Sequence, residues 1–358
     1  MSKLVRRLVG AMLLAVAVYG GLVLWRGVGS VARSFQTYAW ETFAYACALA
    51  FSNYLLRFLK WEYYLAILGI RGIPKGESLL TFLSGFVLTV TPGKVGEVFK
   101  SLILFQTRGV PIARTAPIVV AERVTDLIGV ITIIALGSVS FPGGLVWASA
   151  GATLVVSLLL FVSWRRLSHG LLAVLPRLPG TLGRVGARIA PKVDEALEGL
   201  RELTTPGRLV WPTLLSIVAW ALEGIALWVI LRGFGAPPPL TLTAFFYATA
   251  TLAGALVPVP GGLGVTEKIL EEQLARIGGV ESATATASML LVRFATLWFA
   301  VAVGFAALGL LRARHPSLAT AGDGDASPRP VRGDADAPTG GDATSATPRA
   351  TKGAIESE

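Results

Sequence analysis

Long apolar runs alternate along the chain with short polar stretches. Six runs approach the length of about 20 mostly apolar residues that a membrane-spanning helix needs. They are Leu8–Trp25, Trp40–Phe58, Ala116–Val139, Leu145–Trp164, Leu209–Leu231 and Ala285–Leu311. The pattern predicts an all-α polytopic membrane protein with about six full spans. Lys3, Arg6 and Arg7 precede the first run, but no small-residue cleavage site follows it, so we interpret it as a retained span.

Two further apolar segments, Ser78–Thr91 and Thr243–Val257, are too short to cross a bilayer, and each runs into a Pro-Gly break. The breaks read T-P-G-K-V-G-E and V-P-G-G-L-G-V-T-E. A helical stretch follows each break, over Glu97–Arg108 and Glu267–Ile277. Each unit therefore predicts a re-entrant hairpin, which is two half-helices joined at a Pro-Gly tip.

The two hairpins belong to an internal repeat, with copies at about 40–139 and 209–311. At offsets of 168 and then 170 residues, the matched pairs are Pro92 with Pro260, Glu97 with Glu267, and Arg123 with Arg293. Three crossings separate the starts of the two copies, and an odd number inverts the second copy. Inverted repeats with broken helices that meet near mid-membrane are typical of secondary transporters.

Charge and composition fit this membrane interpretation. Only 15% of the residues are charged, 53% are hydrophobic and the mean hydropathy is +0.65. The net charge of +10 comes from basic residues at the ends of spans, so we predict no nucleic-acid partner. The single cysteine, Cys47, and two distant histidines, His169 and His315, give no readable metal site, and we expect no cofactor.

The distribution of Lys and Arg sets the orientation. It predicts a multi-pass protein of the cytoplasmic (inner) membrane whose N-terminus is cytoplasmic, while the loop with Arg26 and Arg33 lies outside. The domain at 1–314 includes an Arg-rich segment, 165–208, that we interpret as a cytoplasmic amphipathic helix. Residues 315–358 offer almost nothing to bury and are predicted to form a disordered cytoplasmic tail.

The hairpin tips are candidate anion sites, because helix N-termini present backbone N–H groups and a positive partial charge. The candidate substrate-binding residues there are Pro92, Gly93, Lys94 and Gly96 in the first copy and Pro260, Gly261, Gly262 and Gly264 in the second. The alternative is that these residues only turn the chain. Glu97 and Glu267 lie in the first turns that follow, where a carboxylate can cap the helix, neutralise a buried arginine or bind a cationic head group.

A charged element, A-E-R-V-T-D, lies within the third apolar run. Glu122 and Asp126 share a helix face, Arg123 lies beside them, and Arg293 has the matching place in the second copy. Charges at membrane depth normally face the bundle interior and pair, so all four are candidate substrate-binding residues. The alternative is a static salt bridge between helices. Arg57, Lys60 and Trp61 end the second run, and we interpret them as interface anchors.

Four motifs in order carry a resemblance: R-x-x-K-W at Arg57–Trp61, T-P-G-K-V-G-E, E-R-x-x-D at Glu122–Asp126, and P-x-P-G-G-L-G-V-T-E at Pro258–Glu267. Over about residues 5–312 the chain resembles the flippase-like transmembrane domain of bacterial lysylphosphatidylglycerol synthases and its stand-alone relatives. The resemblance implies translocation of a phospholipid or polyprenyl-phosphate-type lipid. Only the tail follows Arg314, so the synthase activity is not implied.

The resulting hypothesis is a lipid flippase without enzymatic activity. Its partner would be a membrane lipid with a phosphate head group, and an oligomer is compatible with the sequence. No phosphate loop couples it to ATP. The alternatives are a secondary transporter of a small soluble anion, a membrane-bound transferase and a membrane scaffold.

Overall fold

The computed structural model describes residues 3–90, 98–138, 197–235, 237–257 and 259–316, together with the single positions 146, 149, 152, 153, 157 and 318. The chain divides into two compact units, Met1–Gly322 and Asp323–Glu358, and all the described residues lie in the first. The predicted tail and most of the predicted segment 165–208 lie outside the described residues.

Every regular element in the described part of the chain is helical. The α-helices are α1 (Lys3–Arg26), α2 (Val28–Gln36), α3 (Trp40–Ile67), α4 (Lys75–Ser84), α5 (Phe99–Arg108), α6 (Ile112–Ser138), α10 (Pro206–Gly233), α11 (Leu240–Leu256), α12 (Val265–Arg276), α13 (Ser282–Arg293) and α14 (Phe299–Arg314). Two 3₁₀ turns, η1 (Gly85–Leu88) and η4 (Pro260–Gly262), adjoin the hairpin breaks. A π-helical turn, η5 (Phe294–Trp298), joins α13 to α14. The all-α class is therefore confirmed.

Two helices are long and apolar enough to cross a membrane: α10, with 28 residues, and the continuous helix Ser282–Arg314, with 33. They match two of the predicted spans. The helices α3 and α6 have 28 and 27 residues, which at about 1.5 Å per residue also exceed a hydrocarbon core of about 30 Å. The predicted span Leu145–Trp164 lies almost wholly outside the described residues, so the number of spans stays a prediction.

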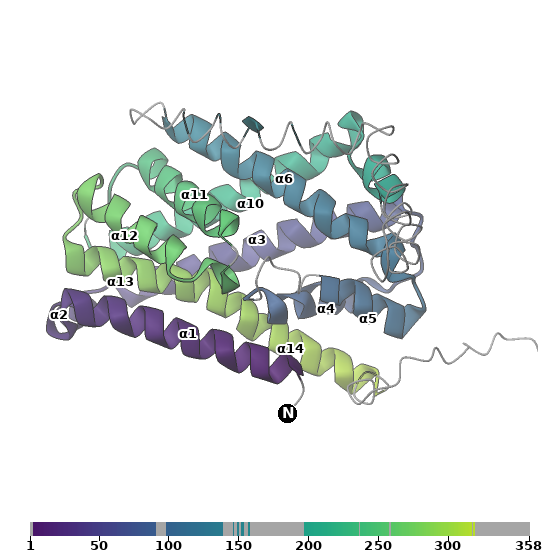
Figure 1. Cartoon of the computed structure of the whole chain (residues 1–358), viewed down its shortest axis with the longest axis horizontal. Helices are drawn as coiled ribbons and strands as arrows, with labels where there is room; N and C mark the ends of the chain where they lie inside the picture. The colour runs from purple at the N-terminus through teal and green to yellow at the C-terminus, as the bar shows by residue number, and fades with distance from the viewer. Residues whose placement is uncertain are drawn as a thin grey trace, which may run out of the picture. The chain divides into compact units, whose positions relative to one another are not determined.

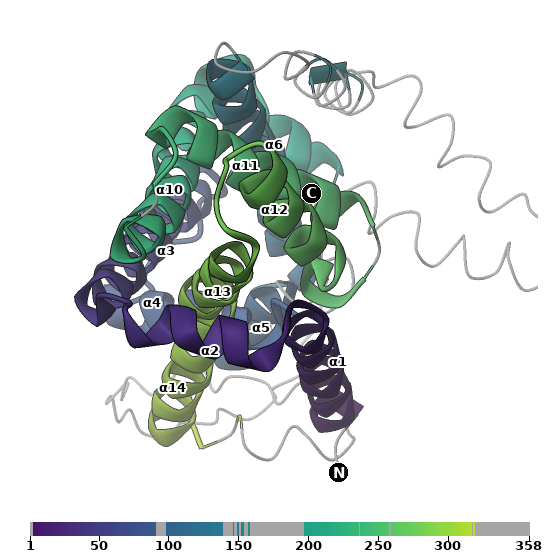
Figure 2. The ribbon, with the colours of Figure 1, turned by 90° about the vertical axis from the view of Figure 1, so that its left-hand side faces the viewer.

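The first predicted loop is a helix instead. The chain bends by 93° between α1 and α2, so Arg33 lies in a helix, and its exterior location stays a prediction. Gly27 has a φ of 88°, a conformation that residues with a side chain rarely adopt. In Figure 2, α2 crosses in front of the end of α13.

The order of helices recurs in the two halves. A long helix (α3 or α10) precedes the first arm of a hairpin (α4 with η1, or α11), and a second arm (α5 or α12) follows the break. Figure 1 shows α4 and α5 together towards one end of the long helices, and α11 and α12 towards the other. These boundaries match the predicted half-helices. The break at 91–97 lies outside the described residues.

The helices α3 and α10, which hold equivalent places in the two halves, pack against each other in opposite directions. Ala39 N–H donates to Gly233 O, and further along α3 the Asn53 amide donates to Ala219 O at 2.8 Å. Positions that rise along one helix therefore meet positions that fall along the other. The inverted relation of the whole repeat stays a prediction.

Close packing at small residues brings other helices together. A Cβ on Gly137 of α6 would lie 2.6 Å from Cβ of Phe245 on α11, and one on Gly304 of α14 would lie 2.7 Å from the backbone nitrogen of Val87 in η1. Such distances permit only glycine without movement of the neighbour, as is common where membrane helices approach closely.

An ion pair joins the two arms of the first hairpin at the end away from its Pro-Gly break. Glu77 in the first turn of α4 accepts from Nε of Arg108, in the last turn of α5, at 3.0 Å, and the imidazole of His315 lies 3.5 Å from the same carboxylate. The hydrogen bonds from Arg108 hold the pKa of Glu77 below its usual range, although partial burial opposes this.

Replacing Glu77 with glutamine should therefore destabilise the protein in a pH-dependent way. A lowered folded-state pKa gives stability that is present above the ordinary carboxyl pKa of about 4.3 and is lost as the pH falls through the folded value. We expect E77Q to lower the thermal midpoint by about 2–4 °C at neutral pH, and by progressively less in acid. Thermal unfolding in detergent across the acidic range measures this, and a difference that is constant with pH would contradict it.

Candidate functional site

The helix α6 carries ionisable side chains deep into the protein. Arg123 lies eleven residues, about 16 Å, from the start of α6, which is close to half the thickness of a hydrocarbon core. Glu122 and Asp126 are both buried and share one face, as the sequence predicted. Glu122 and Asp126 of the E-R-x-x-D element therefore face the interior of the helix bundle, whereas Arg123 is partly exposed.

Asp126 forms a fully buried ion pair with Lys60 of α3. Lys60 Nζ lies 2.6 Å from Asp126 Oδ1, 2.8 Å from the Ser216 hydroxyl and 3.2 Å from the Thr125 hydroxyl. Ser216 donates to the same carboxylate oxygen at 3.0 Å, so it accepts from Lys60. Three acceptors match the three protons of an ammonium group, so the arrangement fits Lys60 in its charged form.

The interpretation of Arg57, Lys60 and Trp61 as interface anchors was wrong for the last two. Lys60 and Trp61 are 0% exposed. The physical reason is rotation of the helix: positions 53, 57, 60 and 64 lie on one face of α3, and this face packs against α6 and α10. The helical spacing of Asn53, Arg57 and Lys60 is the sequence signal that could have revealed the inward face.

Two guanidinium groups approach the other oxygen of Asp126. Arg57 lies 3.5 Å and Arg123 3.9 Å from Oδ2. The Arg123 side chain is 30% exposed, whereas that of Lys60 is 0% exposed. The positive charge of this network is therefore accessible from the surface through Arg123.

Glu122 pairs separately with Lys100 of α5. Lys100 Nζ lies 2.5 Å from Glu122 Oε2, and both side chains are buried. The same ammonium group lies over the rings of Trp61, at 4.6 Å, and Phe82, at 5.1 Å. The sequence analysis did not single out Lys100, because a basic residue in a short helix looks like an interface residue.

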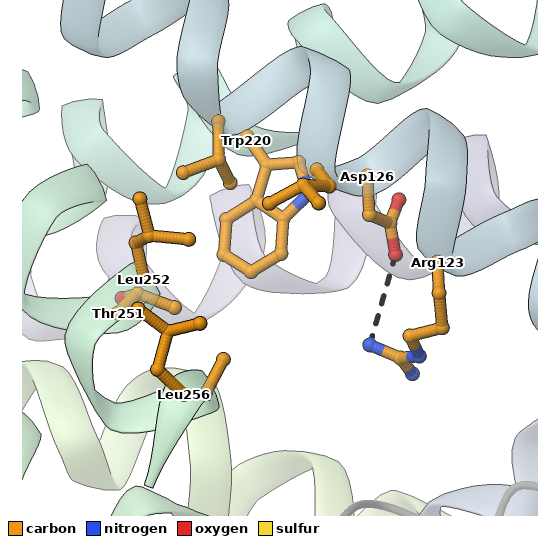
Figure 3. Close-up of a pocket in the computed structure, with 9 residues that line it drawn as sticks. Arg123, Asp126, Trp220, Thr251, Leu252 and Leu256 are labelled. Atoms are coloured by element: carbon orange, nitrogen blue, oxygen red, sulfur yellow. Dashed lines mark ion pairs between the residues drawn. The ribbon is translucent and has the colours of Figure 1, made fainter. Parts of the chain in front are cut away.

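A cavity of about 210 Å³ adjoins the charged face of α6. Its lining residues are Arg123, Asp126, Leu127, Val130, Trp220, Thr251, Leu252, Ala255 and Leu256, contributed by α6, α10 and α11. Figure 3 shows Arg123 and Asp126 on one side, and Trp220, Leu252 and Leu256 on the other. Ala255 and Leu256 are exposed, so the apolar side reaches the surface of the protein. The volume is below the 300 Å³ or so of a typical ligand pocket, so it fits part of a large ligand.

The candidate residues of the second hairpin meet at its tip. Arg293 Nε lies 2.6 Å from Glu267 Oε1, and Arg293 Nη2 donates to Gly261 O at 2.8 Å. The Gly264 N–H donates to Glu267 Oε2 at 2.6 Å. Glu267 therefore caps α12 and also neutralises a buried arginine, two of the roles the sequence left open. Gly261, Gly262 and Gly264 all have positive φ, and Pro260 begins the turn.

The candidate residues of the first tip cannot be compared in this way. Pro92, Gly93, Lys94, Gly96 and Glu97 lie outside the described residues. Their proposed contact with a ligand stays a prediction from the sequence.

Another buried carboxylate, Glu223 of α10, was not predicted. Asn53 Nδ2 donates to Glu223 Oε1 at 2.9 Å, and the Tyr247 hydroxyl donates to Oε2 at 2.6 Å. Asn53 and Glu223 lie on α3 and α10, so this contact joins the long helices of the two halves.

With this geometry established, comparison with known proteins places the chain. The family described as "Lysylphosphatidylglycerol synthase TM region" matches residues 12–304. The chain belongs to this family. The resemblance inferred from its four motifs is thus confirmed, and the family region includes every candidate site residue.

Curated proteins similar to this chain are named as membrane proteins. A "UPF0104 membrane protein" of Methanothermobacter thermautotrophicus is 23% identical over 303 residues, covering 81% of this chain and 90% of the relative. A second match, with the same name and organism, is 31% identical over 100 residues, covering 28% of this chain and 29% of the relative. The family and these names support a membrane protein.

Proposed function

We propose that the protein translocates an anionic lipid, a phospholipid or a polyprenyl-phosphate-type lipid, between the leaflets of the cytoplasmic membrane. The observation that carries the proposal is the cavity beside α6, which joins a charged end at Arg123 and Asp126 to an apolar side that reaches the protein surface. A phosphate head group and a hydrocarbon chain require these two environments side by side.

Arg123 is suited to hold the head group. A guanidinium group binds phosphate oxygens through parallel hydrogen bonds, and it is less strongly hydrated than an ammonium group. Asp126 is neutralised by Lys60 at 2.6 Å, so the cavity does not present an uncompensated negative charge to an anion. The apolar lining, including Leu127, Val130 and Trp220, is suited to the first part of a lipid chain.

The packing of α3 against α10 supports an inverted repeat. These equivalent helices run in opposite directions, with Ala39 against Gly233 and Asn53 against Ala219. Equivalent helices that pack against each other lie near the axis that relates the two copies. An axis in the membrane plane is the arrangement from which transporters derive inward-open and outward-open states.

A secondary transporter of a small soluble anion is the alternative. The same Arg123 would serve it, but most of the cavity lining is apolar, and this favours a ligand with a hydrocarbon chain. We propose transport and no enzymatic reaction, because the matched family is a transmembrane region.

Reconstitution tests the function directly. The purified protein would be placed in liposomes with fluorescent phosphatidylglycerol or, separately, a fluorescent polyprenyl phosphate, and external dithionite would then bleach the accessible label. Protein-dependent bleaching beyond the outer-leaflet fraction is the expected result. Uptake of a soluble phosphate anion without movement of either lipid would contradict lipid translocation and favour the alternative.

Filling the cavity should block the lipid. We expect Ala255→Trp to lower the translocation rate by about tenfold, equivalent to about 1.4 kcal/mol in the barrier, because the indole would occupy the apolar mouth. The matched control is Ala306→Trp, at an exposed alanine on α14 away from the cavity lining. Equal rates for the two tryptophan variants would contradict the assignment of this cavity to the lipid.

A further inference from the structure

The two hairpins are fastened to their neighbouring long helices by different kinds of ion pair. In the first, Lys100 of α5 pairs with Glu122 of α6 at 2.5 Å. In the second, Glu267 of α12 pairs with Arg293 of α13 at 2.6 Å. All four side chains are buried. Each pair thus joins the second arm of a hairpin to the helix that follows it.

The carboxylates of Glu122 and Glu267 differ in how many of their oxygens accept a hydrogen bond. Both oxygens of Glu267 accept hydrogen bonds, from the Gly264 N–H and from Arg293. In the part of the chain that the structure describes, Glu122 Oε1 is buried and has no hydrogen-bond partner, while Oε2 faces Lys100. A proton can therefore bind Oε1 without displacing a donor, whereas a proton on Glu267 would have to displace one.

The surroundings of Lys100 tolerate the loss of its counter-ion. Its ammonium group lies over Trp61 and Phe82, and aromatic faces attract a desolvated cation. Lys100, on the second arm of the hairpin, thus keeps these aromatic neighbours when Glu122 becomes neutral.

We propose that Glu122 is a proton-binding site that couples movement of the first hairpin to a proton gradient. A proton from water forms an O–H bond at Oε1, Glu122 changes from −1 to neutral, and Lys100 keeps its three protons. The attraction between α5 and α6 is lost, and the first hairpin moves away from α6. The second hairpin stays paired with α13. Both oxygens of Glu267 already accept hydrogen bonds, so a proton cannot bind there without displacing a donor.

Several charged or titratable side chains surround Glu122. Lys100 faces it from α5, Lys60 and Tyr64 face it from α3, and Asp126 lies one turn along α6. Asp126 is bonded to Lys60 and Ser216. Arg123 follows Glu122 on α6, and Glu223 of α10 accepts hydrogen bonds from Asn53 and from Tyr247 of α11.

A transport assay with an imposed pH difference tests the coupling, which rests on the proposed lipid translocation. For one proton per lipid, the wild-type protein should accumulate lipid in one leaflet by up to about tenfold per pH unit of gradient. We expect Glu122→Gln to equilibrate the label but to accumulate none. The matched control, Glu202→Gln, neutralises an exposed carboxylate paired with Arg208 and should keep the wild-type gradient response.

Infrared difference spectroscopy tests the proton site whether or not a lipid moves. Between about pH 7 and about pH 3, on either side of the ordinary carboxyl pKa of about 4.3, the wild-type protein should gain a buried carboxylic-acid carbonyl band that E122Q lacks. Translocation that ignores the gradient in the wild-type protein, or an identical band in E122Q, would overturn the proton-site inference and leave lipid translocation standing. Failure of every lipid to move, with the band present, would overturn the proposed function alone.

Discussion

Replacing Asp126 with asparagine is expected to lower the free energy of unfolding by about 3–5 kcal/mol, the typical result of removing one partner from a buried ion pair. Lys60, fully buried, lies 2.6 Å from Asp126, and Arg57 and Arg123 lie within 4 Å of it. Without the carboxylate, three cations would lie close together in a poorly hydrated interior. We expect D126N to accumulate poorly and to unfold early.

Replacing Lys60 with methionine should cost less, which makes the two variants a matched pair. Asp126 would keep Arg57 and Arg123 as counter-ions, and methionine would fill much of the space of the lysine chain. Unfolding in mixed detergent micelles, followed by tryptophan fluorescence, gives both values. Glu202→Gln, in an exposed pair, should change stability by less than about 1 kcal/mol. Equal losses for D126N and K60M would show that Lys60 alone compensates Asp126.

The positions of the helices were largely predictable from the sequence. Apolar runs and Pro-Gly breaks indicate where a chain can be helical in a bilayer. For example, the predicted arm Thr243–Val257 corresponds to α11 (Leu240–Leu256). The family resemblance rested on four short motifs, and it was confirmed. Helix boundaries follow from local composition, which is why they could be predicted.

The partners of the buried charges were not predictable. Hydropathy gives the length of a helix but not its rotation, so Lys60 looked like an anchor although it faces α6 and α10. Lys100 pairs with Glu122 across 22 residues, and Asn53 with Glu223 across 170. These contacts depend on how separate helices pack. The bend at Gly27 was missed for a related reason, because a lone glycine before a polar stretch resembles the start of a loop.

Neutralising Arg123 should abolish most transport without unfolding the protein. We expect Arg123→Gln to reduce lipid translocation by about a hundredfold, equivalent to about 2.7 kcal/mol, because the cavity would lose the guanidinium group that faces the phosphate. Stability should change little, since Asp126 keeps its close pair with Lys60. Adding Lys94→Gln, at the first hairpin tip, should remove the remaining activity.

Arg123→Lys separates charge from geometry at the same position. An ammonium group retains the positive charge but lacks the planar pair of donors that binds two phosphate oxygens. If the head group binds at Arg123, translocation by R123K should lie between that of the wild type and that of R123Q in the dithionite assay. Full activity in the Lys94/Arg123 double variant would remove both residues from the site. The head group would then have to bind elsewhere, and the tip of the second hairpin, where Arg293 contacts Gly261, would be the next position to test.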